Sequence, residues 1–129
     1  MDADERRSEL NRITDAIIGC AFRVSNALGA GFNEKVCENA LAHELRKAGL
    51  QAAQQHPARV MYDGIDVGNY VCDVLVEGCV LVELKAVAQL TNEHLAQCMN
   101  YLKATGLTVC LLVNFGKPKV EIRREVSAF

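Results

Sequence analysis

The sequence holds no apolar run long enough to cross a membrane. Its longest such run, Leu107 to Val113, falls far short of the roughly 20 residues that a bilayer-spanning helix needs. The first residues, Asp2 to Arg7, are mostly charged and contain no apolar core of the kind found in signal peptides. We therefore expect a cytoplasmic protein without a membrane partner.

Paired cysteines are missing as well. The chain has six cysteines and three histidines, but no C-x-x-C pair and none of the ligand spacing of a zinc site. Most of the cysteines fall at apolar positions of the expected helices and strands. This pattern favours buried, reduced thiols over disulfides.

Nothing in the chain marks a second domain, because it has no internal repeat, low-complexity tract or Pro/Gly-rich linker. Half of the 129 residues are hydrophobic and 23% are charged, which is a globular composition. We expect a single domain over 1–129, with an N-terminal helix at about 4–28 and a core at about 33–124.

Acidic and basic residues are nearly equal in number. The net charge of −2 argues mildly against a strong, sequence-independent grip on nucleic acid. It does not exclude such binding, because the distribution of charge matters more than the sum. Basic residues gather near both ends of the chain, where solvated faces are the simpler explanation.

Apolar periodicity predicts helices over about 4–28, from near Asn33 to a stop at Gly49, and from Thr91 or Asn92 to just before Gly106. The predicted strands cover 59–63, 70–76, 80–85, 107–113 and 119–123. The fourth is apolar throughout, as in a strand buried on both faces, and the last alternates like an edge strand. The order α-α-β-β-β-α-β-β indicates an α/β fold, with a mixed β-sheet and flanking helices.

Two carboxylates and an amine occupy neighbouring predicted strands. Asp73 lies in the second strand, and Glu83 and Lys85 lie in the third. Because directly opposed residues of an antiparallel hairpin project from the same face, Asp73 meets Glu83 only if Val76 lies opposite Val80. This register requires a three-residue loop or a bulge, since a two-residue loop puts the acids on opposite faces.

Acids in this position favour a metal site. The residues around them are nearly all valine, leucine or cysteine, so we expect both faces of the hairpin to be largely covered. A covered charge needs a partner, and Mg²⁺ or Mn²⁺ held by two carboxylates beside an amine can act on a phosphodiester. The alternative is a half-exposed hairpin whose charges are solvated, which is the commoner situation.

Five motifs in the same order resemble the GxxExxY family, whose members are similar to the PD-(D/E)XK nuclease superfamily. The motifs are Gly31-Phe32-Asn33-Glu34-Lys35-Val36-Cys37, the Asp73 strand, Glu83-Leu84-Lys85-Ala86, Gln97-x-x-x-Tyr101-Leu102-Lys103-Ala104-Thr105-Gly106 and Leu111-Leu112-Val113-Asn114-Phe115-Gly116. The resemblance extends from about residue 10 to Arg124 and implies a restriction-endonuclease-like core. One departure is that Cys37 stands where the family has its tyrosine.

The resemblance implies a catalytic set of Lys85, Glu83, Asp73 and Glu34. Asp73 and Glu83 would be the metal ligands, and Lys85 would orient or activate water and stabilise charge on the phosphate. Glu34 matches a helical acid that completes the site through the metal or its waters. Otherwise Glu34 is an exposed first-turn glutamate favoured by the helix dipole.

Gln97 and Tyr101 would bind the substrate. They lie four residues apart and hence on one helical face, where they could contact the substrate backbone or the lysine. A core-facing tyrosine beside a satisfied glutamine is the alternative.

The leading hypothesis is a metal-dependent nuclease that hydrolyses phosphodiester bonds of nucleic acid, with DNA as the expected partner. A non-catalytic binding module on the same scaffold is the alternative, since fold does not fix function. A third interpretation is an oligomerising structural protein. A chain of this size would gain a longer substrate groove as a homodimer.

Overall fold

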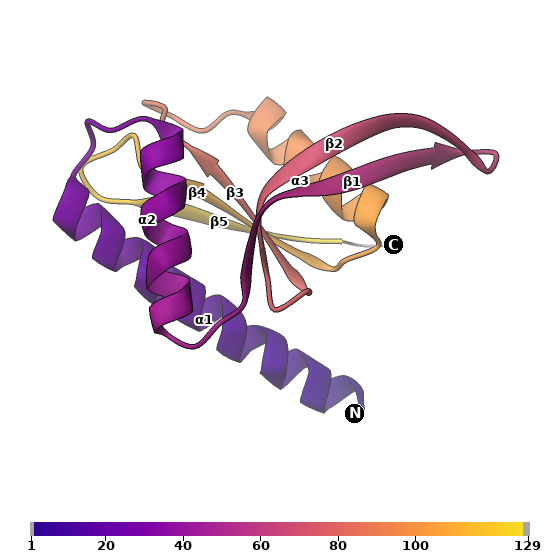
Figure 1. Ribbon diagram of the computed structural model, residues 1–129, viewed down its shortest axis with the longest axis horizontal. Coiled ribbons are helices and arrows are strands. Elements are labelled where there is room, and N and C mark those ends of the chain that lie inside the picture. Colours follow the sequence, from indigo (N-terminus) through magenta and orange to yellow (C-terminus); the bar gives the residue numbers. More distant parts are fainter. Residues whose placement is uncertain (1, 128–129) are drawn as a thin grey trace.

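A computed structural model describes residues 2–127, which form one mixed sheet with helices on both faces (Figure 1). The elements are α1 (Ala3–Leu28), α2 (Glu34–Lys47), β1 (Ala52–Tyr62), β2 (Ile65–Val76), β3 (Val80–Lys85), α3 (Asn92–Thr105), β4 (Val109–Asn114) and β5 (Glu121–Val126). Their order confirms the predicted α-α-β-β-β-α-β-β arrangement and the α/β class. Within residues 2–127, no helix is long and apolar enough to span a bilayer.

The sheet has the strand order β1-β2-β3-β4-β5. β3 and β4 run parallel, and the other neighbours run antiparallel. A parallel pair needs a crossover, and α3 supplies it between β3 and β4. Every residue of β4 is buried, which confirms the prediction of a strand covered on both faces. β5 lies at the edge of the sheet, also as predicted.

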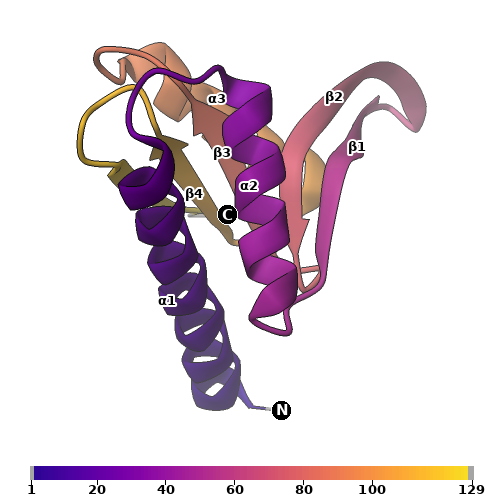
Figure 2. The ribbon, with the colours of Figure 1, turned by 60° about the vertical axis from the view of Figure 1, so that its left-hand side comes forward.

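The helices cover opposite faces of the sheet, with α1 and α2 on one side and α3 on the other (Figure 2). Two apolar clusters follow from this arrangement. The larger joins α1 and α2 to the sheet through residues such as Ile17, Leu41 and Leu111. The smaller lies under α3 and includes Leu81 and Leu102. The sheet therefore separates two cores, and the centre of β3 contacts both.

Side-chain caps fix where the helices begin. Asn33 accepts a hydrogen bond from the Val36 N–H at the start of α2, which was predicted to begin near this residue. Thr91 caps α3, as predicted. His94 completes a capping box, because its Nδ1 accepts the Thr91 N–H at 3.0 Å. His94 therefore has a structural role at the start of α3.

The β2–β3 hairpin has the register that the acid pair requires. Val76 lies opposite Val80, and the ladder continues through Leu75 and Leu81 to Val74 and Val82. The intervening turn has three residues, of which Glu77 and Gly78 have positive φ angles of 53° and 66°. The three-residue loop is therefore confirmed, and Asp73 and Glu83 project from the same face.

Several predicted strand boundaries are wrong. β1 begins at Ala52 instead of 59, because residues 52–58 pair with the inner part of β2. β2 begins at Ile65 instead of 70, because it pairs with β1 beyond the core as an exposed ribbon. β4 begins at Val109 instead of 107. β5 begins at Glu121 instead of 119. Residues 115–120 are needed for the connection from β4, since Asn114 is already paired with Glu121.

Residues 59–71, which we name the distal ribbon, extend away from the body of the molecule (Figure 1). Their large apolar side chains are exposed, with Tyr62 at 69% and Ile65 at 64%. The expectation that both faces of the hairpin are covered is correct for residues 72–76 and 80–84 but wrong at Val71. Val71 is exposed because the β2–β3 ladder stops at Val74, so β3 no longer pairs with this part of β2.

Candidate active site

Asp73 and Glu83 meet where β2 and β3 separate. Beyond the last ladder pair, the Asp73 N–H donates to Glu83 Oε1 at 3.1 Å. In return, the Leu84 N–H donates to Asp73 Oδ2 at 2.8 Å. Each carboxylate thus replaces a backbone hydrogen bond that the ladder no longer provides. These two contacts hold the acids side by side.

The acid pair lies in a poorly solvated environment. Glu83 is only 3% exposed, and burial, followed by the charge of Asp73, raises the pKa of Glu83 to about 9. Burial also raises the pKa of Asp73, although the Leu84 N–H opposes this. Within residues 2–127, neither acid forms an ion pair with a lysine or arginine. The ionised form of the pair is therefore disfavoured, and a bound cation would stabilise it.

Lys85 ends β3, two residues beyond Glu83 and on the same face of the strand. It is half-buried, and its backbone carbonyl accepts the Phe115 N–H at 2.8 Å. No ion pair engages its ammonium group in the described part of the chain. The Lys85 backbone is thus fixed, while its charge is available to an anion.

Glu34 lies in the first turn of α2 and is exposed. Its charge contributes to raising the pKa of Asp73, so the two carboxylates are near enough to interact. An exposed first-turn glutamate was the alternative interpretation of Glu34, and its exposure agrees with it. Its predicted role at the metal or its waters stays a prediction.

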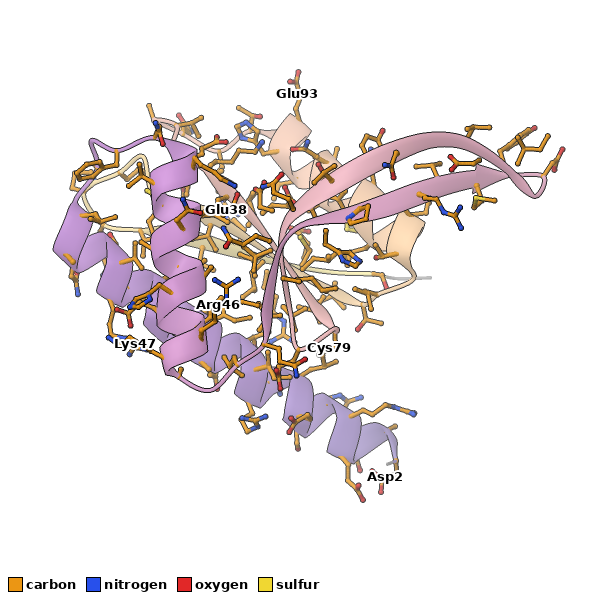
Figure 3. All side chains as sticks on the ribbon, viewed as in Figure 1. Asp2, Glu38, Arg46, Lys47, Cys79 and Glu93 are labelled. Carbon is orange, nitrogen blue, oxygen red and sulfur yellow. The ribbon has the colours of Figure 1, made fainter. Side chains whose placement is uncertain are left out.

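Glu38, one helical turn after Glu34, was not identified from the sequence. It is buried and accepts hydrogen bonds from Lys35 Nζ at 3.0 Å and from the side-chain amides of Gln54 and Gln55 at 2.7 Å each. In Figure 3 it is labelled on α2 beside the strands. The i, i+4 spacing from Glu34 was the signal that could have found it.

The Glu38 network reaches the acid pair through β1. Gln55 has a positive φ of 54°, which is uncommon for a residue other than glycine. It interrupts the β1–β2 ladder between the Gln54 and His56 pairs, opposite Asp73. The negative charge of Glu38 also raises the pKa of Asp73. α2 and β1 therefore help to set the surroundings of the Asp73 carboxylate.

Gln97 and Tyr101 lie on one face of α3, as predicted, and the Gln97 amide donates to the Tyr101 hydroxyl at 3.1 Å. Tyr101 is buried, and its ring meets the Tyr70 ring edge-on at a centroid distance of 5.4 Å. Burial and the charge of Glu83 raise the pKa of Tyr101. This geometry matches the core-facing alternative, and substrate contact by the two residues stays a prediction.

The cysteines are free thiols in the described structure, and five of the six are buried. Cys37 packs in the larger core. Burial raises its pKa, which lowers the thiolate fraction that a nucleophile requires. Cys37 is therefore a packing residue.

The donor set of the acid pair suits an oxygen-preferring cation. Mg²⁺ is commonly held by one or two carboxylates and keeps several of its waters. Among residues 2–127, no cluster of three or more histidine, cysteine, aspartate or glutamate side chains is arranged to hold a metal ion. A site based on two carboxylates and water fits Mg²⁺ or Mn²⁺ better than zinc, which prefers four nitrogen or sulfur ligands.

Comparisons with known proteins identify a family. A family model described as the PD-(D/E)XK nuclease superfamily matches residues 11–125. Among solved structures, the fold is similar to that of an alkaline exonuclease (LHK-Exo) from Laribacter hongkongensis, with a TM-score of 0.53 and 13% sequence identity. The match covers 77% of this chain and 58% of the exonuclease, so the chain spans less than two thirds of that protein. No curated protein matches the sequence significantly.

Proposed function

Because the chain belongs to the PD-(D/E)XK nuclease superfamily, we propose that it is a metal-dependent nuclease that hydrolyses phosphodiester bonds in nucleic acid, with DNA as the substrate. The observation that carries this proposal is the acid pair. Asp73 and Glu83 are held together by reciprocal hydrogen bonds to each other's strands, and Lys85 follows on the face of Glu83.

Asp73 and Glu83 would hold Mg²⁺ or Mn²⁺ through the carboxylate oxygens. The ion would supply an activated water and stabilise negative charge on the phosphate. A buried Glu83 and a half-buried Asp73 with no cationic side chain beside them repel each other when both are ionised. Burial and then this repulsion raise the pKa of Glu83. A divalent cation would remove the repulsion, which supports a metal as the natural partner of the pair.

Lys85 would stabilise the charge of the phosphate and orient the attacking water. An ammonium group is a compact charge with three donors, which suits a non-bridging phosphate oxygen. Glu34 would orient water at the mouth of the site, because it is exposed and lies near Asp73. Gln97 and Tyr101 would contact the substrate beside the acid pair, since the charge of Glu83 reaches the tyrosine.

A non-catalytic binding module is the second candidate. One oxygen of each acid already accepts a backbone N–H, so the pair can also serve as a structural link between β2 and β3. The net charge of −2 favours this candidate as well, because it weakens attraction to a polyanion. Membership of the GxxExxY family, a homodimer and a cytoplasmic location are further proposals from the sequence.

The proposal is tested by cleavage of labelled single- and double-stranded DNA and RNA in Mg²⁺ or Mn²⁺. We expect cleavage by the wild type and a loss on the order of 10²–10³-fold in Lys85→Ala, the range for removing one charge-stabilising group. Glu83→Ala should lose metal binding in calorimetry. Glu5→Ala, an exposed first-turn glutamate of α1, is the matched control and should behave as the wild type.

Each alternative has its own outcome. A wild type that neither cleaves nucleic acid nor binds metal would favour the binding module. Metal binding that survives in both Asp73→Ala and Glu83→Ala would mean that the assigned site is wrong.

A further inference from the structure

Asn114 ends β4 directly beside the E-x-K lysine, since the parallel ladder pairs Lys85 with Asn114. Its side chain is fully buried. The Val87 N–H donates to Asn114 Oδ1 at 3.0 Å, and Asn114 Nδ2 donates to the Val87 carbonyl at 2.9 Å. One amide therefore satisfies both backbone groups of a residue two positions after Lys85.

The same amide makes two further contacts. The Gly116 N–H donates to Asn114 Oδ1 at 2.9 Å, and Asn114 Nδ2 lies 3.4 Å from Glu121 Oε1. A buried asparagine with all of its polar contacts made is a rigid element. Its orientation is set on β4 and β5, whereas the backbone that it holds belongs to the segment after β3.

Gly116 allows the two segments to approach. A Cβ atom at this position would overlap the backbone N and O of Val87 and the carbonyl carbon of Ala86. The φ angle of Gly116 is not positive, so close approach and not backbone conformation explains the glycine. Asn114 and Gly116 together form what we name the Val87 clamp.

The segment held by the clamp adjoins the candidate site. Residues 86–88 directly follow Lys85 and line one side of an open hollow, with residues 30–35, including Glu34, on the other. The chain is tied to the end of β4 at two successive points, because the Lys85 carbonyl accepts the Phe115 N–H at 2.8 Å. The backbone is therefore tied to the end of β4 both at Lys85 itself and two residues later.

We propose that Asn114 and Gly116 are positioning residues, which hold Lys85 and the 86–88 wall in register with the Asp73–Glu83 pair. This inference rests on the proposed nuclease function and extends it to residues that contact neither metal nor substrate. Catalytic geometry is sensitive to such support, because a misplacement of about 1 Å can cost on the order of 10²-fold in rate.

Two chemically different variants test the clamp. Asn114→Ala removes the hydrogen bonds, and Gly116→Ala leaves the asparagine in place but pushes Val87 away. Val113→Ala is the control, since Val113 is the buried neighbour of Asn114 on β4 and packs in the larger core. All three variants lose stability, so they are compared at a temperature at which each is more than nine-tenths folded.

The readouts separate position from stability. Amide hydrogen exchange at Val87 and Phe115 reports the clamp without any need for activity. We expect both clamp variants to speed this exchange at least tenfold and to lower kcat by about 10–100-fold, with KM and Mn²⁺ affinity within about twofold of the wild type. Val113→Ala should retain the exchange protection and kcat.

Several outcomes would overturn the inference. One is an unchanged kcat in Asn114→Ala. Another is an equal loss of kcat in Val113→Ala, which would mean that lower stability, and not a displaced Lys85, reduces the rate. Unchanged exchange at Val87 would show that no clamp operates. If the wild type itself cleaves nothing, the nuclease proposal fails separately, and hydrogen exchange alone then decides whether the clamp holds Lys85.

Discussion

The strand β2 passes through two different environments. Its inner part, residues 72–76, is buried or half-buried, and residues 74–76 of it pair with β3, whereas residues 65–71 belong to the distal ribbon and are exposed. Valines occur in both parts, yet Val74 is fully buried and Val67 is 57% exposed. Composition does not distinguish them. What differs is whether another strand and a helix lie against the residue.

The boundary between the two environments is where Asp73 lies. The ladder to β3 has just ended, so the backbone groups next to Asp73 turn to the side chains of the acid pair instead. A carboxylate fully inside the sheet would have no access to substrate. One on the distal ribbon would be solvated. The junction provides both burial and access, which a reactive acid needs.

The largest effect is expected from a core substitution in the inner sheet. Leu81→Ala in β3 should lower the free energy of unfolding by about 2–5 kcal/mol, because it leaves a cavity in the fully buried cluster under α3. Urea unfolding followed by circular dichroism measures it. If Leu81→Ala lowered the free energy of unfolding no more than a substitution in the distal ribbon does, the inner sheet and the distal ribbon would not differ in their contribution to stability.

The next effect is expected at the junction itself. Glu38→Ala removes the buried acceptor of the Gln54 and Gln55 amides. Gln55 is exposed and Gln54 still donates to Asn39, so the cost should be about 0.5–1.5 kcal/mol, the net contribution of a typical hydrogen bond. The substitution should also lower the pKa of Asp73, because the charge of Glu38 raises it. Carboxyl ¹³C NMR titration measures the second effect.

The control for Glu38 is Glu44→Gln on the same helix. Glu44 contacts Arg23 and Lys47 at the surface, and surface pairs contribute little, so a smaller change is expected. Equal losses from both variants would mean that the network around Glu38 has no special role.

The pH dependence of stability should come from Glu83. The native state keeps a proton on Glu83 up to a pKa of about 9, whereas the unfolded chain loses it near 4.5. Between these values the native state binds more protons, so stability falls as pH rises, by at most about 1.4 kcal/mol per pH unit for one proton. Glu83→Gln should flatten this slope in unfolding experiments from pH 5 to 9.

Metal binding should have the opposite pH dependence. A divalent ion requires both carboxylates in the ionised form, so Mg²⁺ affinity should increase from pH 6 towards 9 and binding should release a proton. Calorimetry in buffers of different ionisation enthalpy measures that proton. Affinity that does not change with pH would contradict the raised pKa of Glu83.

Local patterns predicted much of this molecule because they depend on neighbouring residues. The helix starts near Asn33 and Thr91 and the apolar β4 all follow from adjacent residues. The three-residue turn at 77–79 was instead expected from the requirement that Asp73 meet Glu83, and the observed register agrees with it.

The missed features depend on contacts distant in sequence. Glu38 is held by residues 16 and 17 positions away, and Asn114 by Val87, 27 positions away. No spacing rule connects such partners. The length of the distal ribbon was missed because residues 65–69, Ile-Asp-Val-Gly-Asn, include aspartate, glycine and asparagine, which are depleted in strands. These residues form a strand through their pairing with β1.

The smallest effect is expected at the tip of the distal ribbon. Tyr62 and Ile65 are cross-strand partners, but both are largely exposed, so changing both to threonine should alter the free energy of unfolding by about 0.5 kcal/mol or less. Urea unfolding at several protein concentrations measures it. A loss above about 1 kcal/mol that grows with protein concentration would mean that a second copy covers the ribbon in solution. This result would support the homodimer, and the distal ribbon would then be a buried surface like the inner sheet.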